Sequence, residues 1–204
     1  MTDEGGSLEP RGRGAVDPDP QGPSAAPPTE GRGESPDRSW SLTSLPWPAA
    51  GRALARSPRL LVPVGALVQH GPHLPLGTNT FIAEEVGREV SRRTGVLLAP
   101  TFPYGVRVPE PGGFTGSAGL RRKTLHRAMN ELLADWEDHG IQEFVLLTAH
   151  RHEAHLDALL MALTSSAVLT VVNLFTVDVS DLVTVSPLGE HAGEMETSLM
   201  LHLR

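Results

Sequence analysis

Short apolar runs alternate with amphipathic stretches from residue 60 onward, and this alternation is the strongest constraint on the fold. The apolar runs predict strands at residues 60–64, 96–99, 144–147 and 169–177. Helical spacing predicts three intervening helices with apolar positions at Phe81, Ile82, Val86 and Val90; at Leu125, Met129, Leu132, Leu133 and Trp136; and at Leu156, Leu159, Leu160 and Leu163. Strands that alternate with helices form a largely parallel sheet covered on both faces. We therefore expect a three-layer α/β/α fold with a mainly parallel sheet.

Single residues mark where these elements begin and end. Pro63 has no backbone N–H to donate, so it predicts that the first run lies at a strand end or a sheet edge. Thr78 or Asn79 is expected to cap the first helix, because either side chain can accept a hydrogen bond from the first helical turn. Gly95 and Gly140 predict the ends of the first and second helices.

The first 38 residues differ in composition from the rest of the chain. They consist mainly of Gly, Pro, Ser and charged residues, with almost no large apolar side chains. Such a segment cannot bury enough surface to offset the entropy of ordering it, so residues 1–38 are predicted to be a disordered tail and residues 39–204 an ordered domain. Trp40 and Trp47 begin this domain, and we expect their segment to pack onto it; contact with a neighbouring subunit is the alternative.

Charge and composition exclude several classes of protein. The 204 residues carry a formal net charge of -7, whereas a nucleic-acid partner requires a concentrated basic surface. The chain has no cysteine, so disulfide scaffolds, thiolate zinc sites and cysteine nucleophiles are excluded. Its acidic start does not match a signal peptide, and no apolar run approaches the roughly 20 residues of a membrane-spanning helix. We expect a cytoplasmic protein without nucleic-acid or membrane partners.

Histidines follow two of the predicted strands. His70 and His73 lie in a Gly- and Pro-rich loop after the first strand, and His150 and His152 follow the third. Ligand sites in parallel sheets gather at the carboxyl ends of the strands, so these histidines are expected to converge. Imidazoles placed there can ligate a divalent metal or act as general acids and bases. For His152 a surface position is an equal alternative, and His155 is expected to be a solvated residue on the following helix.

A third polar cluster spans residues 187–198. It contains three glutamates and one histidine directly before an apolar run, which predicts a loop that leads into a helix. Glu194 and Glu196 have two interpretations. They could belong to a site, or they could be acids of the first helical turn that the helix dipole favours.

Together these segments resemble the creatininase (creatinine amidohydrolase) family, and in particular its members that mature the mycofactocin precursor peptide. The family motif Gly-Ser-Thr-Glu-Gln-His-Gly-Pro-His-Leu-Pro, followed by Asp-Thr, is similar to residues 65–80. The family's Phe-Pro-Gly-Thr loop is similar to residues 114–117, and its Asn-Gly-His-Gly-Gly-Asn run falls on residues 148–153. The late motif Glu-His-Ala-Gly-x-x-Glu-Thr-Ser is complete at residues 190–198. The resemblance covers residues 41–204.

The resemblance implies a fold, an oligomer and a chemistry. Family members commonly form hexamers, and their one or two divalent ions (Zn, Mn or Fe) activate water that opens a small cyclic amide or cuts a peptide bond. By position, His70 and His150 match metal-ligating histidines, and Glu196 matches a late glutamate of the metal site. Glu190 and His191 match catalytic residues near the substrate, and His191 corresponds to a proton donor for the leaving nitrogen.

The chain also departs from the family motifs. Val68 stands in place of a glutamate ligand, and Asn79 stands in place of the aspartate expected to bridge two ions. Arg151, His152 and Glu153 replace small or amide residues. Divalent ions favour anionic oxygens, so the loss of two carboxylates predicts a degenerate site without a two-metal centre.

Two functions follow from these observations, and a site rebuilt for different chemistry around Arg151, His152 and Glu153 is a third possibility. The first is a metal-dependent C–N hydrolase whose ligands come from His70, His150, Glu196, Asn79 and His152, with one ion or none bound. The second is a catalytically inactive family member that acts as a binding or partner subunit. Because the chain ends directly after the last motif, where relatives continue, it is also expected to be a shortened relative.

Overall fold

The computed structural model describes residues 41–109, 113–185 and 190–204. The predicted tail of residues 1–38 lies outside these ranges, and so does Trp40. In chain order, the described elements are η1 (Leu42–Ser44), α1 (Trp47–Arg56), β1 (Arg59–Val64), α2 (Thr78–Thr94), β2 (Leu97–Leu98), α3 (Arg122–Asp138), β3 (Glu143–Thr148), α4 (Glu153–Leu160), β4 (Val168–Asn173), η2 (Leu174–Thr176) and α5 (Glu194–Leu203). None of the helices in these ranges is both long and apolar enough to cross a bilayer.

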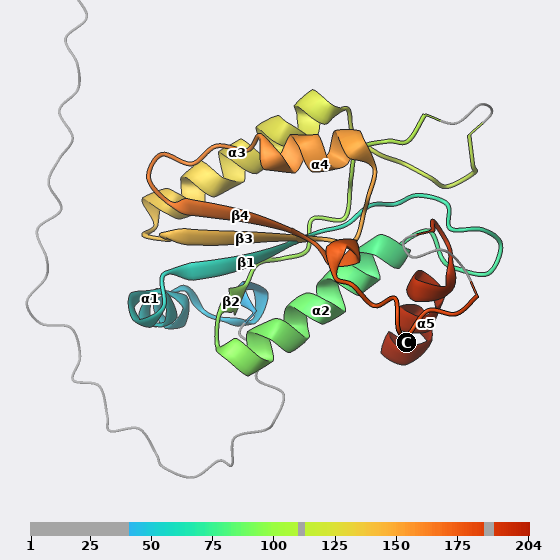
Figure 1. Ribbon diagram of the computed structural model, residues 1–204. Coiled ribbons are helices and arrows are strands. Elements are labelled where there is room, and N and C mark those ends of the chain that lie inside the picture. The colour runs from blue at the N-terminus through green and yellow to red at the C-terminus, as the bar shows by residue number, and fades with distance from the viewer. Residues whose placement is uncertain (1–40, 110–112, 186–189) are drawn as a thin grey trace, which may run out of the picture. The chain divides into compact units, whose positions relative to one another are not determined.

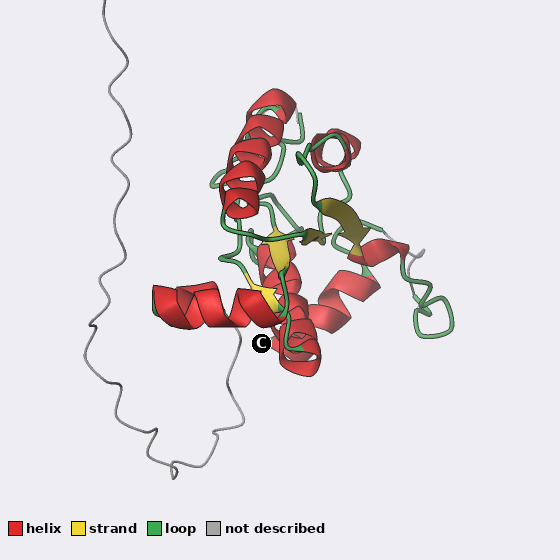
Figure 2. Ribbon diagram, turned by 90° about the vertical axis from the view of Figure 1, so that its left-hand side faces the viewer, coloured by secondary structure: helices red, strands yellow, loops and turns green. Residues whose placement is uncertain are grey.

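The strands form one parallel sheet in the order β2-β1-β3-β4. The carboxyl ends of the three longer strands are in register, since Val64 pairs with Thr148 and Thr148 pairs with Asn173. Helices α3 and α4 cover one face of the sheet, and α2 and α5 lie on the other (Figures 1 and 2). The predicted three-layer α/β/α fold with a parallel sheet is confirmed.

Alternate residues of β1 face the two helical layers. Leu60 and Val62 belong to the core cluster that includes Leu125 of α3, whereas Leu61 packs in a second cluster with Val86 of α2. A strand buried on both faces requires apolar residues at successive positions. This explains why the sequence shows a continuous apolar run here rather than an alternating pattern.

The structure confirms one predicted detail of the elements and corrects two others. Pro63 is the penultimate residue of β1, beside the point where β2 ends, so its predicted place at a strand end is confirmed; β1 itself lies inside the sheet and not at its edge. Its carbonyl accepts from the N–H of Phe102, so on the side where Pro63 lacks a donor, pairing continues through Phe102 after the end of β2. The strand predicted at 169–177 ends at Asn173, whose side chain caps the turn η2. Helix α4 ends at Leu160, so Leu163 lies outside it.

The start of the domain packs only in part as predicted. Leu42 and Leu45 contact the main core, and helix α1, which the sequence did not predict, buries Ala53 in it. Trp47 is 86% exposed, so the prediction that it packs onto the domain is wrong. Trp47 is the first residue of α1, and the helix turns its later residues Ala53 and Leu54 toward the core instead.

Candidate functional site

The site lies where the loops after β1 and β3 meet the segment that leads into α5 (Figure 1). Gly65, directly after β1, allows the strand end to press against the first turn of α2. A Cβ atom at this position would lie 2.6 Å from the Cα of Thr80. This close approach requires glycine, and it places Asn79 beside the strand ends. The prediction that Thr78 or Asn79 caps α2 is wrong, because both residues lie inside the helix and the N-cap is Gly77, which has no side chain to accept a hydrogen bond.

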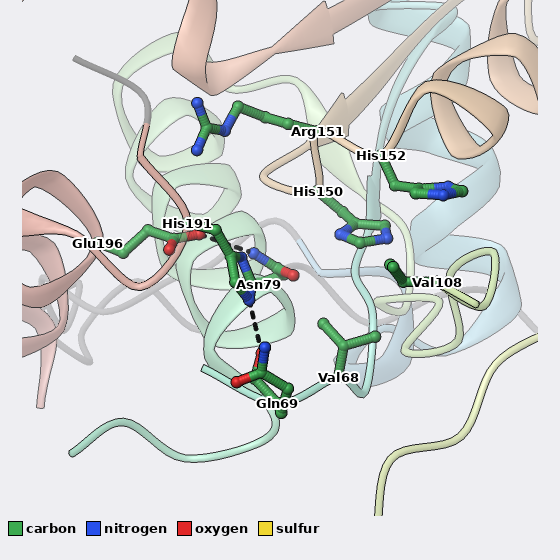
Figure 3. A pocket seen from close by; sticks show the side chains of 9 residues that line it. All are labelled: Val68, Gln69, Asn79, Val108, His150, Arg151, His152, His191 and Glu196. Carbon is green, nitrogen blue, oxygen red and sulfur yellow. Dashed lines mark hydrogen bonds between the residues drawn. The ribbon is translucent and has the colours of Figure 1, made fainter. Parts of the chain in front are cut away.

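The site is a cavity of about 360 Å³. Figure 3 shows its lining: Val68, Gln69, Asn79, Val108, His150, Arg151, His152, His191 and Glu196. Most of the site residues predicted from the sequence are therefore brought together. His70 is fully buried behind this lining, where it contacts His191 and Glu196. Glu190 is exposed and does not line the cavity.

A hydrogen bond to Nδ1 of His70 determines which nitrogen of the neutral ring carries the proton. Its Nδ1 lies 2.9 Å from the carbonyl oxygen of Val68. A carbonyl can only accept, so in the neutral ring Nδ1 carries the proton and Nε2 holds a free lone pair. Nε2 is buried, makes no hydrogen bond with any described residue, and lies 3.5 Å from Oε1 of Glu196. An imidazole nitrogen in this state is suited to bind a metal ion.

Glu196 is a buried carboxylate at the start of α5, with 2% of its surface exposed. Burial alone would raise its pKa. A hydrogen bond and the charge from His70 in its protonated form, the N–H of Ala192 and the charge of His191 outweigh this effect and hold the pKa of Glu196 below its usual value. Asn79 also donates from Nδ2 to Glu196 Oε1 at 3.2 Å. The carboxylate is therefore ionised at neutral pH.

His191 is exposed and lies beside His70 and Glu196. Its Nε2 donates to the carbonyl of Gln69 at 2.8 Å, and its ring centroid lies 4.6 Å from that of His70. One ligand atom from each of His70, His191 and Glu196 lies within 4.8 Å of the other two. A tetrahedral zinc ion with bonds of about 2.0–2.1 Å holds its ligands about 3.4 Å apart. The 3.5 Å separation between His70 and Glu196 already fits this geometry.

His150 and His155 form a second buried group. His150 Nε2 lies 3.3 Å from the carbonyl of Val106, and His155 Nε2 lies 3.0 Å from Oγ1 of Thr148. Burial, with a smaller contribution from neighbouring imidazoles, lowers the pKa of His150 to about 4 and that of His155 to about 3. Both rings are therefore neutral at pH 7, and His150 keeps a lone pair on Nδ1 because its Nε2–H donates to the carbonyl.

His155 was predicted to be a solvated helical residue, and this prediction is wrong. It is fully buried, and its Nδ1 accepts from the N–H of Val106. A signal was present in the sequence, because His155 stands four residues before the buried Leu159 and so lies on the same face of α4. Gln69 and Val108, which the sequence analysis did not single out, also line the cavity.

The remaining predicted residues divide between the cavity and the surface. His152 lines the cavity, and its Nδ1 is buried without a hydrogen-bond partner among the described residues. Asn79 Oδ1 is likewise buried and has no hydrogen-bond partner among the described residues. His73 is exposed and lies 3.3 Å from the hydroxyl of Thr197. Val68 presents only carbon atoms to the cavity, so it offers no ligand for a metal.

Comparison with known proteins gives a consistent result. The profile of the family described as "Creatininase: Creatinine amidohydrolase" matches residues 43–204. A creatinine amidohydrolase of Pseudomonas putida is 30% identical over 165 residues, which cover 71% of this chain and 64% of that protein. A mycofactocin precursor peptide peptidase of Mycobacterium ulcerans (strain Agy99) is 33% identical over 159 residues, which cover 72% of this chain and 58% of that protein. The chain thus spans less than two thirds of the length of these relatives.

Solved structures agree with the sequence comparison. A structure described as "Creatininase Mn" has a TM-score of 0.70 and 27% identity, covering 80% of this chain and 72% of the other. A mutant creatininase described as the "Zn-Zn type" has a TM-score of 0.67, 26% identity and the same coverage.

Proposed function

Because the chain belongs to the creatininase family, we propose that it is a metal-dependent C–N hydrolase with a degenerate site for a single divalent ion. One observation carries this proposal: the buried, unpartnered Nε2 of His70 lies 3.5 Å from the carboxylate of Glu196. A free imidazole lone pair facing an ionised carboxylate in a dry interior is costly unless a cation or a proton lies between them.

The proposed ligands are His70, Glu196 and His191. Two histidines and one glutamate are a known ligand set of catalytic zinc sites, which leave a fourth position open for water. Zn, Mn and Fe all suit this mixture of imidazole and carboxylate. A second ion is not supported, because Val68 offers no ligand atom and Asn79 turns its Nδ2 donor, rather than an oxygen, toward Glu196.

A bound divalent ion would supply Lewis acidity, which polarises an amide carbonyl and lowers the pKa of water. Glu196 would bind and orient that ion from α5, while the Val68 carbonyl fixes the tautomer of His70. If His191 acts as a ligand, it does not also serve as the proton donor that the resemblance implies. His152, with its unpartnered Nδ1 in the cavity, is then the imidazole placed to give a proton to the leaving nitrogen.

The substrate is proposed from the relatives. Their names, creatinine amidohydrolase and mycofactocin precursor peptide peptidase, describe cleavage of an amide C–N bond in a small cyclic compound or in a peptide. We propose the same bond type here, with maturation of a mycofactocin-type peptide as the specific form. A homo-oligomer, hexameric by resemblance, is part of the proposal; light scattering of the purified protein tests it.

A second function is favoured by one observation. The Nδ2 group of Asn79 donates to Glu196 and so satisfies part of the carboxylate without any metal. A family member stabilised in this way could act without catalysis, as a binding or partner subunit.

Metal analysis separates the two functions. After reconstitution with Zn, Mn or Fe, the wild-type chain is expected to retain about one ion per chain. Changing His70→Ala or Glu196→Gln removes a ligand and should abolish retention, whereas His139→Ala at the exposed end of α3 should not. His191→Ala distinguishes its two roles, since loss of the ion indicates a ligand and loss of hydrolysis alone indicates a proton donor. A wild-type chain that retains no ion under any of these conditions would contradict the hydrolase proposal.

A further inference from the structure

Arg151 is the one lysine or arginine among the lining residues that the structure describes. It follows β3 directly after His150 and precedes the first residue of α4 by two positions. In Figure 3 its side chain extends toward the side of the cavity where His191 and Glu196 lie, and away from His152. A permanent positive charge is therefore part of the cavity wall.

The position of Arg151 leaves its hydrogen-bond donors free. Its guanidinium carbon lies 5.0 Å from the centre of the Phe175 ring, which packs in the core formed by α2 and α5. This cation–π contact fixes the side chain without using its N–H groups. Within the described ranges, the guanidinium makes no hydrogen bond and no ion pair. Its planar fork of donors matches the two oxygens of a carboxylate.

The charges around the cavity also favour an anionic ligand. Glu196 is the one carboxylate among the described residues of the lining, and it is already engaged by Asn79 and by the Ala192 N–H. Val68 and Asn79 stand where the family motif has a glutamate and an aspartate, and Arg151 stands where it has a glycine. Each of these three replacements makes the cavity more positive by one charge.

We propose that Arg151 binds the terminal carboxylate of a peptide substrate and so selects bonds next to a free C-terminus. This inference rests on the proposed hydrolase function and narrows its substrate class. Water would add to the acyl carbon as the C–N bond breaks, and the C-terminal residue would leave with its amine protonated. The cavity volume of about 360 Å³ suits a ligand of this small size. Val68 and Val108 give the leaving residue apolar surroundings.

Binding to the metal-free full-length chain provides the first test. The probes are acetyl-Gly-Val with a free carboxylate and the same peptide as its C-terminal amide, compared by calorimetry. The wild type is expected to bind the acid at least about tenfold more tightly, the effect of one charge-assisted fork. Arg151→Met should remove this preference, and Arg151→Lys should keep part of it. Arg122→Met, a matched change on exposed α3, should leave the preference unchanged.

These experiments distinguish a failure of the proposed Arg151 site from a failure of the proposed hydrolase function. Equal binding of acid and amide, an unchanged preference in Arg151→Met, or no binding of either probe would overturn the role of Arg151. A preference that depends on Arg151 in a chain without hydrolytic activity would support the anion site and count against the hydrolase alone. The zinc-loaded chain adds a second readout, because Arg151→Met should lower kcat/KM for the acid and leave that for the amide unchanged. Acetyl-Asp amide tests a side-chain carboxylate as the alternative source, and binding equal to that of acetyl-Gly-Val would overturn selection for the C-terminus.

Discussion

Asn79 connects the carboxylate of the site to the strand end behind it. Its side chain is 1% exposed, and Nδ2 donates both to the Ala149 carbonyl at 2.8 Å and to Glu196 at 3.2 Å. The amide thus takes a place where a cation could otherwise balance Glu196. Asn79 therefore gives Glu196 a neutral donor at a position where the family motif has a second carboxylate, the type of ligand that divalent ions prefer.

Changing Asn79→Asp should make the metal-free protein less stable and its stability more dependent on a bound metal ion. An aspartate cannot donate to Ala149, and it would place a second carboxylate about 3 Å from Glu196. Loss of the hydrogen bonds and like-charge repulsion are expected to lower the metal-free stability by about 2 kcal/mol, or about 4–8 °C in Tm. Zinc should then raise the Tm of Asn79→Asp more than that of the wild type, because the ion gains an anionic ligand. Thermal unfolding with and without zinc measures both effects.

A matched control for this change is Asn173→Asp at the end of β4. The Asn173 side chain uses its oxygen to accept from the N–H of Phe175, and aspartate keeps that acceptor. Its effect is expected to stay within about 0.5 kcal/mol, with no new response to zinc. If Asn79→Asp raised the metal-free Tm, or if zinc stabilised it less than the wild type, the balancing role of the amide would be wrong.

At the scale of elements, Glu137 joins the end of α3 to the segment between α4 and β4. Its carboxylate accepts from the N–H groups of Ser165, Ser166 and Ala167 and from the Ser166 hydroxyl. The hydrogen bond from the Ser165 N–H is the largest of the effects that lower the pKa of Glu137 to about 2, even though partial desolvation opposes them. One side chain therefore holds the start of β4 against the helical layer.

Glu137→Gln is predicted to lower the Tm near pH 7, because the amide loses the charge and one acceptor oxygen. The folded pKa lies below the usual value of 4.5, so the stabilisation is complete above about pH 4.5 and is lost as the pH falls toward about 2. The difference in Tm between wild type and variant should therefore narrow as the pH falls below about 4.5. Glu131→Gln, an exposed change on the same helix, should show no such difference at any pH. A gap that stayed constant down to pH 3 would contradict this account.

The sequence predicted the sheet well because its signals are local. Residues 60–64 form an apolar run that is buried between two helical layers, and it corresponds to β1 with an error of one residue. Helix α1 was not predicted, because it buries only Ala53 completely and contains Gly51 and Pro48, which weaken helical periodicity. The predicted end of a strand was wrong where a side chain caps a turn, as the Asn173 side chain does at the end of β4.

The site was harder to predict because its contacts join distant segments. The loops of His70 and His150 could be expected to meet, since parallel strands end at one edge of the sheet. The direction of the Asn79 amide could not, because it depends on the Ala149 carbonyl 70 residues further along the chain. Glu196 had two interpretations in the sequence, and only the packing of α5 against α2 shows that it is buried.

For the molecule as a whole, the contacts described above lie within residues 41–204. The main core takes Leu42, Leu45 and Ala53 from the start of the domain, and the family profile begins at residue 43. Residues 1–38 have the composition of a segment that cannot form a core of its own. We therefore expect folding, and the metal binding proposed above, to depend on the part of the chain that follows them.

Deleting residues 1–38 is expected to leave the Tm and the retained metal unchanged, because no large apolar surface is removed with them. Deleting residues 1–56 is the matched comparison, since it also removes α1 and the core contacts of Leu42, Leu45 and Ala53. Each large side chain lost from a core costs about 2–5 kcal/mol, so the longer deletion should unfold at a much lower temperature or fail to fold. Thermal unfolding and metal analysis of the two proteins make the comparison. A large fall in Tm for the shorter deletion would show that the first 38 residues contribute to the folded domain, contrary to their composition.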